Sequence, residues 1–130
     1  MKRRSLVTSN SGVAAVEMAF ALPIMIMMIW IIIQLGLVFR ATSGMQHALG
    51  EGARAATIWP EPPASAIKLA VEQAVYGAGP GEFEVPDPIP GTNCACLDVT
   101  VRYTQNVNLL LLPGPTITIE RSKRVWTAGT

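Results

Sequence analysis

The chain has 130 residues, enough for one small domain, and half of them are hydrophobic, a high share for a water-soluble protein. Ten basic and nine acidic residues leave a formal net charge of +1, and no long basic block occurs. Nothing in the sequence therefore indicates a nucleic-acid-binding surface, and we expect no nucleic acid among the partners.

The hydrophobic residues are concentrated in one run, from Val13 to Phe39, in which only Glu17 and Gln34 are strongly polar. A helix needs roughly 20 apolar residues to cross the hydrocarbon core of a bilayer. We therefore predict a transmembrane helix at residues 13–39. A cleaved secretory signal peptide is the alternative, but the run is longer than the apolar part of such signals, and no clear A-x-A pattern follows it.

The charges on either side of this run predict its orientation. Lys2, Arg3 and Arg4 precede it without an acidic residue, whereas acidic and basic residues are mixed after it. Loops that stay in the cytoplasm carry the excess of Lys and Arg. We therefore expect residues 1–12 to form a basic cytoplasmic leader, and we expect the C-terminal part to be exported.

Residues 40–59 predict that the helix continues beyond the membrane. Small residues recur there at every fourth position: Gly44, Ala48, Gly52 and Ala56. This spacing places them along one side of a helix, where another helix can approach closely. We expect this stripe to support helix packing, either on its own domain or on another subunit. A loose juxtamembrane segment is the alternative.

Residues 60–130 are predicted to form an exported α+β domain. Apolar residues with helical spacing predict a second helix at residues 64–76. Alternating apolar and polar residues predict strands near residues 82–85, 97–104 and 116–120, with proline-rich loops at 86–91 and 112–115. The expected fold is a long N-terminal helix, one further helix and a small antiparallel sheet of about three strands.

Four consecutive leucines, Leu109–Leu112, precede the sequence Pro113-Gly114-Pro115. They exceed what a hairpin loop needs. They either complete a buried strand or form an exposed apolar patch that contacts a partner or the membrane surface.

Cys94 and Cys96 form a C-x-C pattern beyond the apolar run. If this part is exported, the cysteines face an oxidising compartment, where a disulfide persists. We expect a disulfide between them or with another chain, and free buried thiols are the alternative. A structural metal needs about four ligands, and His47 is the one histidine, so we expect no metal.

Nothing in the sequence indicates catalysis. No serine has a base and an orienting acid in a recognisable pattern, and neither a phosphate-binding loop nor a paired-acid motif occurs. We expect a protein that is not an enzyme, with no cofactor and no small-molecule substrate.

The start of the apolar run carries a more specific pattern, a glycine followed five residues later by a glutamate, in the string Gly12-Val13-Ala14-Ala15-Val16-Glu17-Met18-Ala19-Phe20-Ala21-Leu22-Pro23. This string resembles the TadE-like family of tight-adherence (Flp) pilus systems, and so does Gly50-Glu51-Gly52-Ala53-Arg54-Ala55-Ala56. The resemblance implies a type IV pilin-like minor pilin, or pseudopilin, of the bacterial inner membrane. The implied partners are other pilins, the pilus assembly platform and a prepilin peptidase.

The resemblance also implies roles for three residues. The peptidase would cut between Gly12 and Val13, and the new Val13 amine could pair with Glu17 of a neighbouring subunit in a filament. Each charge would then remove the desolvation cost of the other. The alternative for Glu17 is a position at the headgroup level, in contact with water. The alternative function is an uncleaved single-pass anchor whose exported domain binds other secretion or envelope components.

Overall fold

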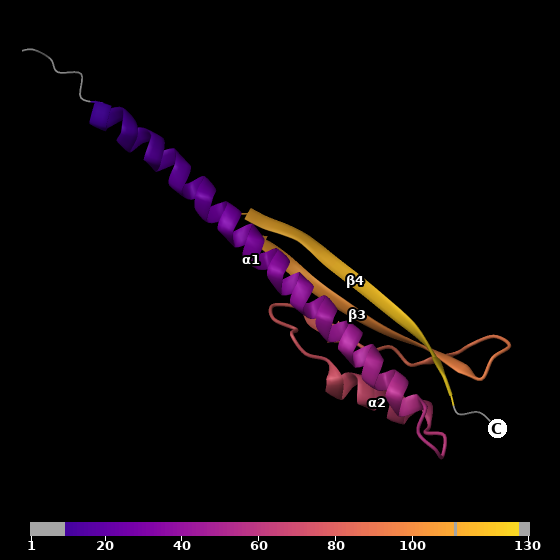
Figure 1. Ribbon diagram of the computed structural model, residues 1–130. Coiled ribbons are helices and arrows are strands. Elements are labelled where there is room, and N and C mark those ends of the chain that lie inside the picture. Colours follow the sequence, from indigo (N-terminus) through magenta and orange to yellow (C-terminus); the bar gives the residue numbers. More distant parts are fainter. Residues whose placement is uncertain (1–9, 111, 128–130) are drawn as a thin grey trace, which may run out of the picture.

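The computed structural model describes residues 10–110 and 112–127, so Leu111, the last three residues and the basic residues of the leader lie outside the described part. The elements, in chain order, are α1 (Asn10–Ala56), α2 (Ala64–Ala74), β1 (Glu82–Glu84), β2 (Ile89–Pro90), β3 (Cys96–Leu109) and β4 (Leu112–Trp126) (Figure 1). The α+β class predicted from the sequence is confirmed.

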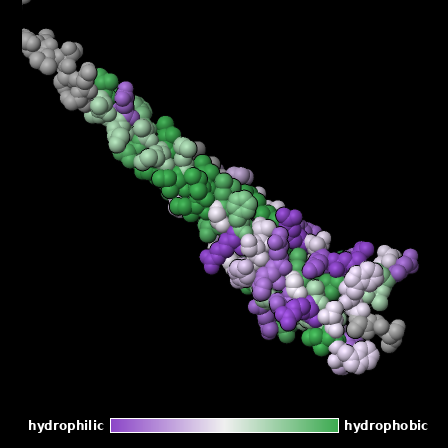
Figure 2. Space-filling view, in the orientation of Figure 1, coloured by the Kyte–Doolittle hydropathy of each residue, from purple (hydrophilic) through white to green (hydrophobic). Residues whose placement is uncertain are grey.

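Helix α1 is one continuous helix of 47 residues that includes Pro23. Its C-terminal half lies on the rest of the chain, whereas its N-terminal half projects beyond the domain and lies beside the β3–β4 hairpin only near Trp30, among the described residues (Figure 1). Figure 2 shows that the projecting half is covered by apolar side chains and that polar side chains gather around the α+β domain. One helix therefore has two different surroundings along its length.

The sheet is organised around β3. Strand β4 pairs with β3 in an antiparallel hairpin from Cys96 opposite Trp126 to Leu109 opposite Leu112. The two short strands β1 and β2 pair with the other edge of β3, also antiparallel. The sheet thus has four strands rather than about three, because the two-residue strand β2 lies within the segment predicted as a loop at residues 86–91.

The predicted loop at residues 112–115 is wrong. These residues form the start of β4, and Pro113 pairs opposite Asn108. Proline has no backbone N–H to donate to a ladder, so a sheet accepts it mainly at an edge strand. In the part of the chain that the structure describes, β4 pairs only with β3, and the hairpin can therefore extend through the prolines towards the leucines.

The two faces of β3 differ as the alternating sequence predicts. Val99, Val101 and Tyr103 are fully buried and belong to one apolar core with residues of α1 and α2. On the opposite face, Arg124 binds Asp98 (Nε to Oδ1, 2.9 Å), and this hydrogen bond lowers the pKa of the Asp98 carboxyl. This cross-strand pair is exposed to solvent, so it fixes the register of the strands more than it adds stability.

The stripe of small residues on α1 faces the chain's own domain. All four members are buried: Gly44, Ala48, Gly52 and Ala56. A Cβ atom on Gly52 would overlap the Cγ2 atom of Val71, which is buried on α2. The small side chains therefore allow α2 and the segment after it to approach the backbone of α1.

Replacing Gly44 tests this packing. In a Gly44→Ala variant the new Cβ would overlap the carbonyl oxygen of Tyr76, which is backbone and cannot rotate away. We expect a loss of about 1–3 kcal/mol in stability. For a domain of this size, that loss lowers the thermal midpoint by roughly 4–8 °C per kcal/mol.

Gly50→Ala is the matched control, because nothing lies within 4 Å of its added Cβ. Alanine favours the helix by about 1 kcal/mol over glycine, so the control should unfold at the same or a higher temperature. Circular dichroism of the full chain in detergent measures both midpoints. Equal midpoints for the two variants would contradict the close approach at Gly44.

Candidate functional site: the projecting half of the first helix

The projecting half of α1 exposes large apolar side chains around its whole circumference. Val13 and Phe20 are 62% and 72% exposed, and most of the large apolar residues up to Ile33 are exposed as well. A helix that is apolar on all sides requires lipid or other helices around it. By length and composition, α1 is able to cross a membrane, and almost none of its most apolar segment is buried.

Gly12, Val13 and Glu17 lie together at the free end of this helix. All three are exposed, and no atom lies within 4 Å of a Cβ built on Gly12. Val13 and Glu17 are one helical turn apart, so both side chains lie on the same side of α1. Among the ion pairs of the described residues, none includes Glu17. A neighbouring molecule can therefore reach the Gly12–Val13 bond and the Glu17 carboxylate.

Gln34 is the first buried residue of α1 from Gly12 onward, and a buried polar network marks this point. Gln105 Nε2 donates to Gln34 Oε1 (2.8 Å), and the Tyr103 hydroxyl donates to Gln105 Oε1 (2.8 Å) or to the Ala78 carbonyl oxygen (2.8 Å). Burial raises the pKa of Tyr103, so the phenol stays protonated as a donor. Leaving a buried amide unpaired costs about 1–3 kcal/mol, which the network avoids.

The sequence does indicate Gln34 as a polar residue within the apolar run, but not its partner. Gln105 lies 71 residues further along the chain, in a strand whose alternation gives no information about α1. A second contact that the sequence does not predict lies further along α1 towards its N-terminus. There the Trp30 indole Nε1 donates to the Asn108 carbonyl oxygen (2.6 Å) at the end of β3.

Cys94 and Cys96 form a disulfide at the end of the hairpin that is opposite to Asn108. Gly91 lies against them: its N–H donates to the Cys96 carbonyl oxygen (2.9 Å), and an added Cβ would overlap the Cys96 sulfur. His47 is exposed beside the ring of Tyr76, at 5.6 Å between centroids. Within the described ranges, no three His, Cys, Asp or Glu residues gather in a way that could hold a metal.

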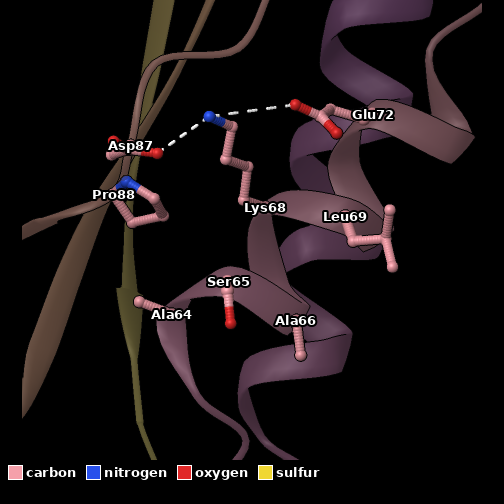
Figure 3. A pocket seen from close by; sticks show the side chains of 8 residues that line it. All are labelled: Ala64, Ser65, Ala66, Lys68, Leu69, Glu72, Asp87 and Pro88. Atoms are coloured by element: carbon pink, nitrogen blue, oxygen red, sulfur yellow. Dashed lines mark hydrogen bonds and ion pairs between the residues drawn. The ribbon is translucent and has the colours of Figure 1, made fainter.

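An open surface groove of about 740 Å³ lies between the start of α2 and the segment at Asp87 (Figure 3). Lys68 points across it, with its Nζ 2.8 Å from Asp87 Oδ1 and 3.9 Å from Glu72 Oε1. The hydrogen bond to Asp87 raises the pKa of Lys68. Glu72 and Asp87 therefore both bind Lys68 within the groove.

In its described residues, the chain belongs to a class of protein in which one apolar helix, able to span a membrane, carries a small α+β domain. A model of the family of TadE-like proteins matches residues 12–54, which confirms the resemblance predicted from the sequence. No curated protein and no solved structure matches the chain. The matched residues all lie within α1, so the likeness concerns this helix.

Proposed function

We propose that the protein is a minor pilin, or pseudopilin, that takes part in the assembly or priming of a bacterial tight-adherence (Flp, type IVc-like) pilus. The observation that carries the proposal is the projecting half of α1, which is apolar on all sides and ends at Gly12, Val13 and Glu17. The family match begins at the same glycine. Such a helix suits a bundle made with helices of other pilin subunits.

The proposed topology is a single-pass inner-membrane protein with a cytoplasmic N-terminus. Residues 1–12 form the leader, residues 13–39 the span, residues 40–59 the continuation of the helix, and residues 60–130 the exported domain. The positive charges of Lys2, Arg3 and Arg4 support this orientation. A prepilin peptidase at the cytoplasmic face would then cut between Gly12 and Val13.

Cutting would remove the charges that hold the N-terminus at the membrane surface, and α1 could then leave the bilayer along its axis. The same cut would give Val13 a free amine at the exposed end of α1. In a filament, this amine could bind Glu17 of an adjacent subunit. A charged acid in an apolar span costs on the order of 2–3 kcal/mol near the bilayer centre and less towards its edge, and pairing would remove that cost. The pairing would favour one register between neighbouring helices.

A reporter fused after Thr130 tests the topology. An enzyme that is active only outside the cytoplasm should be active in this fusion, because the basic leader holds the N-terminus inside. An enzyme that is active only in the cytoplasm, fused at the same residue, is the control and should be inactive. The opposite pattern would show that the orientation is wrong.

Glu17→Gln tests the pairing. The change keeps the size and the hydrogen-bonding capacity of the side chain but removes its charge. Breaking one partner of a buried ion pair costs several kcal/mol, so we expect pili to decrease by roughly tenfold or more, with membrane insertion unchanged. Electron microscopy counts the pili, and carbonate extraction measures insertion.

Met18→Gln is the matched control for this variant, because it places an amide one residue away and leaves the Glu17 carboxylate in place. It should assemble nearly as well as the natural chain. If Glu17→Gln cells make pili at the natural level, Glu17 has no pairing role. If both variants fail equally, an added amide explains the defect, and the charge does not.

A further inference from the structure

The tip of the β3–β4 hairpin lies beside the segment of α1 that the proposed function places in the membrane. We define the hairpin tip as residues 108–110. The Asn108 carbonyl oxygen accepts the hydrogen bond from Trp30, and Leu110 shares a small apolar hollow with Met27, Trp30 and Ile31. These partners precede Gln34 by three to seven residues, which is about 5–10 Å along a helix.

The length of the projecting half of α1 indicates where the hairpin tip lies relative to the bilayer. From Val13 to Ile33, α1 rises roughly 30 Å, which is the thickness of a typical hydrocarbon core. If Val13 lies at the cytoplasmic boundary of the hydrocarbon core, the opposite boundary of that core falls near Gln34, within the proposed span of residues 13–39. The contacts of the hairpin tip with Met27 and Trp30 would then lie inside that boundary, in the leaflet on the domain side.

The composition of the hairpin changes sharply towards this tip. The charged residues of the two strands lie far from the tip, and none occurs between Tyr103 and Ile119. Leu110 is 52% exposed beside α1, and its neighbours in sequence are also leucines. This distribution suits a hairpin that has one end in water and the other in an apolar medium.

Two further features reduce the cost of placing this backbone against lipid. Pro113 and Pro115 have no N–H group, so the start of β4 presents two donors fewer, and unpaired donors are costly in the bilayer. The indole of Trp30 binds the Asn108 carbonyl oxygen, which leaves that acceptor satisfied. Tryptophan is also enriched at the boundary between hydrocarbon and headgroups.

We propose that the hairpin tip inserts into the bilayer leaflet on the domain side, so that the protein holds the membrane through both α1 and Leu110. The occupant of the apolar surface at the tip is lipid, because this surface is continuous with the lipid-facing side chains of α1. This inference rests on the proposed membrane-spanning role of α1. Insertion at two points would fix the depth and the tilt of α1 before assembly.

Depth-dependent quenching tests the insertion. The full chain carrying Leu110→Cys is labelled with an environment-sensitive fluorophore and placed in phosphatidylethanolamine–phosphatidylglycerol vesicles at a low protein-to-lipid ratio. We expect blue-shifted emission that lipids with brominated acyl chains largely quench. Labelling is done without reductant, since Cys94 and Cys96 form a disulfide, and the natural chain is labelled in parallel to measure background.

Two further labelled positions make the outcomes distinguishable. Thr118→Cys, exposed on β4 away from the hairpin tip, should not be quenched, whereas Phe20→Cys, on the projecting half of α1, should be quenched. Quenching at Phe20 but not at Leu110 would overturn the insertion of the tip and leave the proposed function intact. Absence of quenching at both would overturn both proposals. Blue-shifted emission at Leu110 that depends on protein density, without quenching by lipid, would assign the tip to a second copy of the chain and overturn the inference.

Discussion

The structure depends on one constraint. As one unbroken helix, α1 must suit an apolar medium along its first half and pack into a protein core along its second half. The change occurs at Gln34, whose side-chain oxygen accepts a hydrogen bond from Gln105. An amide at this point would be unpaired if lipid surrounded the helix, and unpaired buried amides are costly. The bond therefore ties the sheet to one position along α1.

The domain in turn depends on α1. Ala41, Met45, Ala48 and Leu49 are buried in the same core as the inward face of β3 and the apolar side of α2. The sheet packs one face against α1, and α2 packs on α1 through the small residues. Because the core is shared, the projecting half of α1 is a direct extension of the folded domain. Movement of that half along its axis would carry the domain with it.

The sequence predicts most of the fold, because the periodicities of its elements are strong. The alternation from Leu97 to Tyr103 predicts the central strand, and the spacing of apolar residues predicts α2. The prediction fails at residues 112–115, where Pro-Gly-Pro indicates a loop and the free edge of β4 accepts the prolines in a strand. The contacts of Trp30 and Gln34 connect residues 78 and 71 positions apart, and no local pattern reports such pairs.

For the candidate site, the sequence predicts which residues matter, but the fold of the chain does not contain their partners. Gly12, Val13 and Glu17 are recognisable as a pattern, and the family match covers them. Their geometry within one chain shows that they are exposed at the end of α1, but their proposed partners belong to other molecules. Their roles therefore follow from chemistry between chains, which the fold of a single chain does not contain.

The central claim is that α1 is released for assembly by removal of the leader, and the intact mass of the protein from membranes of its native host tests it most directly. The account predicts a mass that begins at Val13, with residues 1–12 absent. A protein that retains Met1 to Gly12 would contradict the account. It would favour the uncleaved anchor.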